Sequence, residues 1–132
     1  MKFIASSVEL SSTGGEHFQV VLDESDQDNS PYVLLQNSFE FPAGAAYFEC
    51  HNPDLSGHGR VRRCELRRTS LEIDVTDSDE HITVLFNESE EKIGSLGWIL
   101  RIILNKRTPF LNSSGISEHP IDGQGVEFDA WK

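Results

Sequence analysis

The alternation of apolar and polar residues is clearest between residues 60 and 87, where it predicts a β-hairpin followed by a third strand. Apolar side chains occupy every second position on either side of Arg68-Thr69, which we expect to form the turn. Because successive side chains of a strand point to opposite faces, a slip of one residue would turn the whole apolar set toward water. We therefore expect a firm register, with one buried face that carries Cys64, Leu66, Leu71, Ile73 and Val75.

The opposite face of this hairpin is charged. The same register sets Arg63 against Asp74, a favourable cross-strand pair, and Glu65 against Glu72, an unfavourable one. Arg-Thr is not a preferred two-residue turn, so a longer loop or a bulge is the alternative. An arginine cluster can bind phosphate, but beside acids such as Asp74 and Glu72 we expect the arginines to pair within the sheet.

The two-residue period also predicts strands outside the hairpin. Residues 2–10 are expected to form a first strand, and the Ser, Thr and Gly cluster at 11–15 a turn into the second. Residues 23–30 contain no apolar residue and are expected to form an exposed loop. The strands expected beside those of the hairpin lie at residues 2–10, 17–22, 32–36, 46–51 and 82–86.

The apolar period then becomes that of a helix, predicted at about residues 88–105. Asn87 is expected to be the N-cap, and Glu90 three residues later completes a capping-box pattern. Gly94 and Gly97 are unfavourable in a helix interior, so we expect the helix to approach a sheet closely there. The apolar stripe of this helix consists of Ile93, Leu96, Leu100 and Ile103.

These elements predict an α+β fold, in which one long helix packs on one face of an antiparallel sheet of about six or seven strands. The length of 132 residues suits one domain with a sizeable core. We assign residues 1–107 to a single α+β domain and residues 108–132 to a C-terminal extension. The extension has no clear period, and the place in it where an edge strand could dock is Val126–Phe128.

The formal net charge of −11 is unusual above all in its distribution. Residues 3–59 contain no Lys or Arg, whereas five arginines crowd into the hairpin that follows. Such a balance disfavours nucleic acid and anionic membranes as partners and favours a basic protein. The alternative is a charge that only keeps the protein soluble. The acids in this segment are Glu9, Glu16, Asp23, Glu24, Asp26, Asp28, Glu40, Glu49 and Asp54.

The sequence predicts a cytoplasmic protein. No apolar run reaches the roughly 20 residues that a membrane span needs. The N-terminal residues alternate like a strand and lack the uninterrupted apolar core of a signal peptide. We expect the only two cysteines, Cys50 and Cys64, to be buried thiols rather than a disulfide, since both fall within predicted strands.

Candidate chemistry is sparse. Cys50, His51, His58 and Cys64 are all potential zinc ligands, but their spacing matches no compact zinc site. The chain contains no G-x-S-x-G motif, and no helix N-terminus is placed behind a nucleophile. The expectation is therefore a protein that is not an enzyme, with no catalytic residues, no cofactor and no metal.

Four segments carry a resemblance: the acidic loop and strand from Asp23-Glu24 to Gln36, Tyr47–Glu49, Val61–Ile73 with its Glu65-Leu66-Arg67-Arg68 core, and Ile82–Leu104. In order and spacing they together resemble the immunity protein 10 family of bacterial polymorphic toxin systems. The resemblance covers about residues 1–105 and implies a small cytoplasmic protein that binds and neutralises a cognate toxin. The glycines of the predicted helix and the extension from Thr108 depart from the family pattern.

The acidic loop is the expected partner-binding site, because it is too polar to have a role in the core. Its acids Asp23, Glu24, Asp26 and Asp28 would face a basic toxin domain, such as a nuclease, and Tyr32 and Phe39 would supply apolar anchors. The alternative functions are a small-ligand or carbohydrate binding module and a structural subunit. In a carbohydrate module, stacking would come from Trp98, Trp131 and Tyr47.

Overall fold

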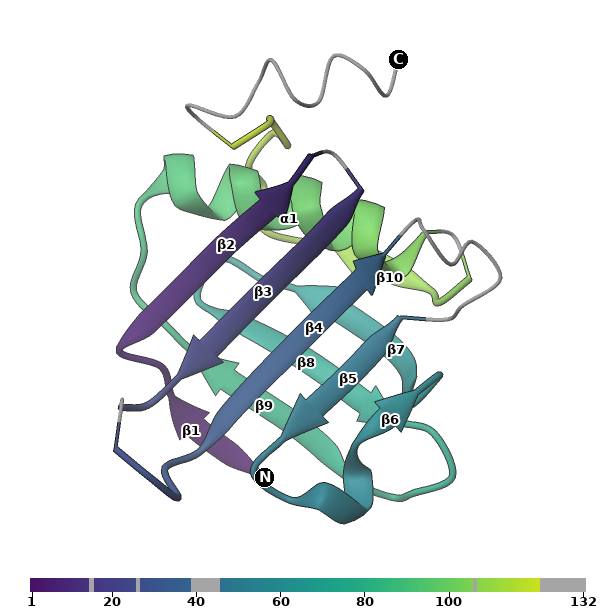
Figure 1. The fold of residues 1–132 in the computed structure, drawn as a ribbon. Coiled ribbons are helices and arrows are strands. Elements are labelled where there is room, and N and C mark those ends of the chain that lie inside the picture. Colours follow the sequence, from purple (N-terminus) through teal and green to yellow (C-terminus); the bar gives the residue numbers. More distant parts are fainter. Residues whose placement is uncertain (15, 26, 39–45, 106, 122–132) are drawn as a thin grey trace.

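The computed structural model describes residues 1–14, 16–25, 27–38, 46–105 and 107–121, and has an α+β fold with two five-stranded sheets (Figure 1). We call the first the meander sheet, because its strands follow one another antiparallel in chain order. A short 3-10 helix, η1 (Pro53–Leu55), lies in the connection before its last strand. The strands of the meander sheet are β2 (Ser7–Thr13), β3 (His17–Asp23), β4 (Tyr32–Ser38), β5 (Tyr47–Cys50) and β6 (Gly57–His58).

The second sheet, which we call the hairpin sheet, is built around the predicted central hairpin. Its outer strands on both sides pair parallel to their neighbours, whereas the three central strands are antiparallel. In spatial order its strands are β1 (Lys2–Ile4), β9 (His81–Leu85), β8 (Ser70–Val75), β7 (Val61–Leu66) and β10 (Phe110–Asn112).

The prediction of one antiparallel sheet with six or seven strands was therefore wrong. Residues 2–10, expected as one strand, are divided between β1 in the hairpin sheet and β2 in the meander sheet. The burial pattern contains the reason: Phe3 and Ala5 are buried at odd positions, whereas Val8 is buried at an even one. This change of phase marks the point where the chain crosses from one sheet to the other.

The core lies between the inner faces of the two sheets, whose strands run in crossing directions in Figure 1. Helix α1 (Glu90–Leu104) packs against β2, β3 and β4 and also contacts β10, so it closes one end of the space between the sheets. None of the helices in the described part of the chain is long and apolar enough to span a membrane. Fully buried side chains from both sheets and the helix include Phe18, Leu35, Phe48, Leu71, Ile73 and Leu96.

The predicted register of the central hairpin is confirmed. Leu66 pairs with Leu71 and Cys64 with Ile73. The turn at Arg68-Thr69 is closed by a hydrogen bond of 2.8 Å from the Arg67 N–H to the Ser70 carbonyl. The irregularity considered for this hairpin lies away from the turn, because the register shifts by one residue between Val61 and Arg63.

The predicted N-cap was wrong by two residues. Ser89, not Asn87, precedes the helix, and its hydroxyl accepts a hydrogen bond of 3.2 Å from the Lys92 N–H. At the other end Asn105 adopts the left-handed conformation that often terminates helices. The predicted apolar stripe is fully buried, and Ile99 and Leu104 extend it because the helix fills the end of the core.

Gly94 makes room for the chain after the helix, whereas Gly97 faces two strands of the hairpin sheet, so the predicted close approach to a sheet is found at Gly97. A Cβ on Gly94 would lie 2.6 Å from the His119 ring and 2.7 Å from the Ser117 carbonyl oxygen. A Cβ on Gly97 would lie 2.7 Å from the side-chain Nδ2 of Asn112 on β10 and 3.4 Å from the Leu66 side chain on β7. The extension adds an edge strand at β10, which the sequence analysis missed, whereas the expected site at residues 126–128 lies outside the described residues.

Candidate functional site

The outer face of the meander sheet is made of cross-strand rows set by its register. Side chains two residues apart on one strand share this face, so each row brings together residues that are distant in sequence. The face is richest in aromatic and acidic side chains over β3, β4 and β5. Its central row consists of Glu9, Val21, Leu34 and Glu49, and the rows on either side contain Asp23 with Tyr32, and Gln36 with Tyr47 and His58.

Glu49 is held between two tyrosines on this face. The Tyr32 hydroxyl donates a hydrogen bond of 2.5 Å to Glu49 Oε2, and the Tyr47 hydroxyl donates one of 2.8 Å to Glu49 Oε1. These hydrogen bonds lower the pKa of Glu49. Burial and the hydrogen bond to Glu49 raise the pKa of Tyr32 to about 12, and the bond to Glu49 also raises the pKa of Tyr47. At neutral pH the group is therefore one carboxylate between two neutral phenols.

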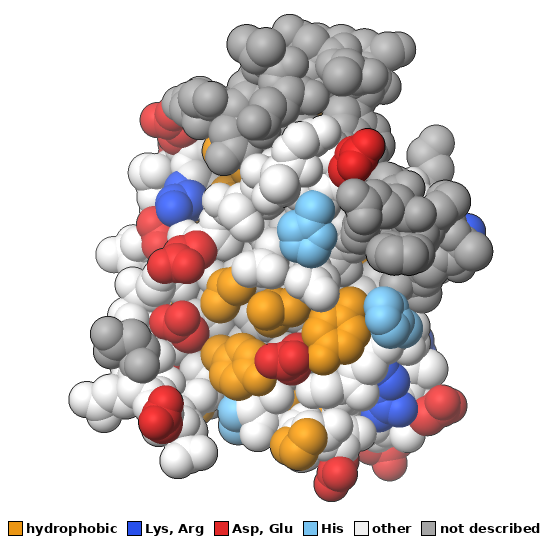
Figure 2. Space-filling view, in the orientation of Figure 1, with side chains coloured by type: hydrophobic (Ala, Val, Ile, Leu, Met, Phe, Trp, Pro, Cys, Tyr) orange, Lys and Arg blue, Asp and Glu red, His pale blue; other side chains and the backbone are white. Residues whose placement is uncertain are grey.

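A hollow of about 790 Å³ lies beside these three residues and is open to solvent. Val21 and Leu34 contribute apolar lining, and the loop between β3 and β4 forms a polar wall through residues 25 and 27–30. In Figure 2 hydrophobic side chains gather over β3, β4 and β5, with a carboxylate among them. The volume is in the range of ligand pockets, roughly 300–1,000 Å³. An open hollow of this kind suits a side chain that protrudes from a partner.

A histidine lies next to each tyrosine. His51 Nδ1 accepts a hydrogen bond of 3.3 Å from the Tyr32 backbone N–H, and the two ring centroids are 6.4 Å apart. The rings of Tyr47 and His58 are closer, with centroids 5.2 Å apart. These contacts restrict the orientation of both tyrosine rings, so the group around Glu49 is largely preorganised.

The carboxylates of the meander sheet have no basic partner within the described residues. Every ion pair found there uses a carboxylate from Glu65 onward in the chain. Lys92 of the helix does reach β2, but its ammonium donates to the Val8 carbonyl at 2.8 Å. Within the described residues, no ion pair neutralises the negative charge of this face.

The structure brings part of the predicted partner site to this hollow. Asp23, Asp28 and Tyr32 line it. Glu24 is exposed at the start of the loop but is not part of the lining, and its backbone N–H donates to the Pro31 carbonyl at 3.0 Å. Asp26 and Phe39 lie outside the described residues, so their predicted roles stay predictions.

The sequence analysis missed Glu49 as a site residue. Its signal was present, because the alternation around Phe48 and Cys50, both buried, turns Tyr47 and Glu49 outward together. The alternation cannot reveal that Tyr32 reaches the same carboxylate. That contact depends on the offset between β4 and β5, in which Glu49 pairs with Leu34.

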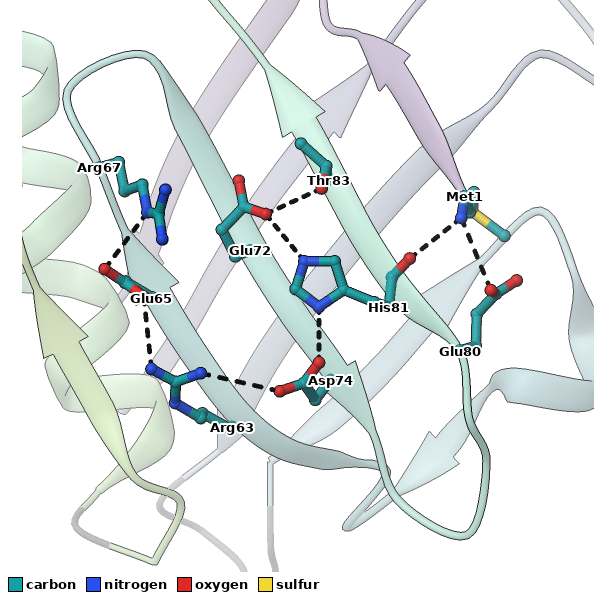
Figure 3. Close-up of polar contacts among 9 residues, drawn as sticks. All are labelled: Met1, Arg63, Glu65, Arg67, Glu72, Asp74, Glu80, His81 and Thr83. Carbon is teal, nitrogen blue, oxygen red and sulfur yellow. Dashed lines mark hydrogen bonds and ion pairs between the residues drawn. The ribbon is translucent and has the colours of Figure 1, made fainter.

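The outer face of the hairpin sheet carries charges that pair with one another (Figure 3). Glu65 lies 3.4 Å from Arg63 and 3.3 Å from Arg67, and it also accepts a hydrogen bond of 2.9 Å from the Ser113 hydroxyl. The Ser113 and Arg67 contacts lower the pKa of Glu65. Arg63 also lies 3.9 Å from Asp74, so the predicted pairing of arginines with cross-strand acids is found there.

His81 of β9 replaces an arginine as the partner of Glu72, against the sequence prediction. Its Nδ1 is 2.5 Å from Asp74 Oδ1, and its Nε2 is 2.8 Å from Glu72 Oε1. The hydrogen bonds to Asp74 and Glu72 raise the pKa of His81. The hydrogen bond to His81 lowers the pKa of Asp74. Burial alone would raise the pKa of Glu72, but its hydrogen bonds, above all the one to His81, lower that pKa overall.

The remaining candidate residues are dispersed. Cys50 and Cys64 are buried free thiols on strands of different sheets, and burial raises the pKa of both. His51 and His58 are exposed, and no three potential metal ligands converge within the residues that the structure describes. Trp98 packs edge-on against the buried Phe18, at 6.3 Å between ring centroids.

The aromatic set expected for carbohydrate stacking is therefore not assembled on one surface. Trp98 lies on the core side of the meander sheet, since it packs on a buried residue of β3, whereas Tyr47 lies on the outer face. Trp131 lies outside the described residues.

Comparison of the chain with protein-family models, with curated proteins and with solved structures found no match in any of the three.

Proposed function

We propose that this protein is an immunity protein, which neutralises a cognate bacterial toxin by binding it stoichiometrically and without turnover. The observation that carries the proposal is the outer face of the meander sheet. It combines an ionised carboxylate, two tyrosines and an acidic loop around one hollow, within a segment that contains no Lys or Arg from residue 3 to residue 59. The resemblance to the immunity protein 10 family supports the same function.

A basic partner suits this face for an electrostatic reason. Nuclease toxins carry positive charge because they grip phosphate, so an acidic inhibitor can occupy the same surface and associate quickly. Salt bridges with a partner would use carboxylates that the fold leaves without basic partners, so binding would break no internal ion pair of the described residues.

Apolar contact must add to the charges. A specific interface buries about 1,600 Å² in total, or roughly 800 Å² from each partner, which is more than the acidic loop can offer. Tyr32, Tyr47, Val21 and Leu34 supply apolar and aromatic surface next to the loop. The proposed interface therefore has an aromatic centre and an acidic rim.

The function is tested by co-expression with the neighbouring toxin gene, which we expect to encode a large secreted protein with a variable C-terminal domain. Wild-type protein is expected to restore growth and to form a complex of fixed stoichiometry with the purified toxin domain. Growth arrest that persists at normal expression of the protein, together with no complex in vitro, would refute the proposal.

The role of the loop is tested by a charge-matched pair of double variants. Asp23→Asn/Asp28→Asn removes two acids that line the hollow, one at the end of β3 and one in the loop after it. Asp77→Asn/Asp79→Asn removes two exposed acids of the β8–β9 turn. The first is expected to slow association by roughly 3- to 10-fold at low salt, a part of the 10–10³-fold that steering can supply in total. The control should change the rate much less. Equal rates for the two variants would remove the loop from the interface.

A further inference from the structure

The arrangement around Glu49 has the three features that a guanidinium group requires. The carboxylate supplies two oxygens, the tyrosines supply aromatic rings, and Val21 and Leu34 supply an apolar lining beside them. We infer that this hollow is the anchor site for a single arginine side chain of a partner protein, an inference that rests on the proposed function.

The hydrogen bonds of Glu49 leave it able to accept more. Each of its oxygens takes one hydrogen bond from a tyrosine hydroxyl. A carboxylate offers about four lone-pair positions, so each oxygen retains one for an outside donor. The fork of N–H groups on arginine matches the two oxygens of a carboxylate, and such paired bonds are strong as well as directional.

The tyrosines do more than position the carboxylate. Their neutral hydroxyls donate to Glu49 without placing a competing positive charge there, and their rings are left to contact the guanidinium group. The planar guanidinium is weakly hydrated and stacks on aromatic rings within about 6 Å of their centroids. The apolar stem of an arginine can lie along Val21 and Leu34 while its charged end reaches Glu49.

Arginine fits this site better than lysine. The lysine ammonium is a compact, strongly hydrated charge that cannot span both carboxylate oxygens with a rigid fork. Within the described residues no Lys or Arg side chain of the protein makes an ion pair with Glu49. The proposed occupant is therefore a side chain of another molecule, the partner protein.

The site is tested directly with three short peptides that differ only in one residue: arginine, lysine or citrulline, the neutral isostere of arginine. Each is titrated into the full chain while backbone and tyrosine resonances are followed by NMR. The arginine peptide is expected to bind saturably in the millimolar range, with shifts centred on β4 and β5. The lysine peptide should bind several-fold more weakly, and citrulline should not saturate. Equal binding of citrulline, or shifts centred elsewhere, would overturn the inference.

Two variants on one cross-strand row provide the matched comparison. Glu49→Gln keeps the shape of the side chain and an acceptor for the tyrosines but removes its charge, whereas Glu9→Gln makes the same change on β2, outside the hollow. Glu49→Gln is expected to abolish saturable binding of the arginine peptide, and Glu9→Gln should retain it. Equal binding by the two variants, with both folded by NMR, would overturn the site.

The same variants separate this inference from the proposed function. In a hot spot the loss of a central contact weakens a complex by at least about 30-fold, and we expect that loss of toxin affinity for Glu49→Gln. If wild-type protein protects and Glu49→Gln binds toxin with unchanged affinity, the arginine anchor fails and the immunity function stands. If wild-type protein does not protect but binds the arginine peptide at β4 and β5, the immunity function fails and the cation site stands.

Discussion

The outer faces of the two sheets both carry acidic side chains but differ in electrostatic organisation. On the hairpin sheet Arg63 and Arg67 pair with Glu65, and His81 pairs with both Glu72 and Asp74. On the meander sheet the partners of Glu49 are neutral tyrosines. One face pairs its own charges, whereas the other orders a carboxylate that has no basic partner among the described residues.

This difference separates a face whose charges stabilise the fold from the face that we propose binds a partner. A charge that is already paired offers a partner little, because binding would first have to break the internal pair. A preorganised carboxylate without a cation gains its counter-charge only on binding. The total charge of the protein does not reveal this distinction, since both faces contain acids.

The largest expected loss of stability comes from substitutions in the core between the sheets, and it should be similar for the two sheets. Leu35→Ala on β4 and Ile73→Ala on β8 each remove most of a side chain that is fully buried. Each is expected to lower the free energy of unfolding by about 2–5 kcal/mol. Urea denaturation of both variants checks this. A much smaller loss for Leu35→Ala would mean that the meander sheet contributes less to the common core.

A smaller effect on stability should differ between substitutions on the two outer faces. Glu65→Ala removes a side chain that contacts Arg63, Arg67 and Ser113, whereas Glu9→Ala removes an exposed one on β2. We expect Glu65→Ala to lower the midpoint of thermal unfolding clearly more than Glu9→Ala, because it leaves three polar groups without their shared acceptor. Equal midpoints would contradict the conclusion that charge pairing on the hairpin sheet contributes to stability and that the acids of the meander sheet do not.

The smallest expected effect is the pH dependence of the hairpin sheet. The folded-state pKa of His81 is raised, so its contribution is complete below the unfolded pKa of about 6.5 and is lost as pH rises through the folded value. The pKa values of Glu72 and Asp74 are lowered, so their contribution is present above their unfolded values and is lost as pH falls through the folded ones. The cluster therefore stabilises most in mildly acidic solution.

This pH dependence is checked by urea denaturation between pH 5.5 and pH 8.5, a window of roughly one to two units on either side of the unfolded histidine pKa. Wild-type stability is expected to decline by less than about 1 kcal/mol as pH rises, because the pairs are partly exposed. His81→Gln should remove most of the decline, whereas His17→Gln on the meander sheet should leave it in place. A decline that persists in His81→Gln would assign it to other groups.

The sequence was sufficient to predict those features of the fold that a local pattern of residues determines. Strict alternation gave the register of the central hairpin, and the helical period gave the buried stripe of α1. The division into two sheets could not be predicted, because it depends on parallel pairings such as Lys2 with Thr83, for which no turn sets the offset. The candidate site shows the same limit: the polar loop pointed to Asp23 and Asp28, but Glu49 joins Tyr32 only through the pairing of β4 with β5.

The crossing of the chain from β1 to β2 has a consequence for the order of folding. The meander sheet and the central hairpin join strands that are neighbours in sequence, so their ordering closes only short loops. Closing a longer loop costs more entropy, and contacts of high sequence separation slow folding. Pairing of Lys2 with Thr83 closes one of the longest loops in the chain, and β1 is joined to β2 through Ala5-Ser6 alone. The docking of β1 is therefore expected late in folding, as the step that locks the two sheets together.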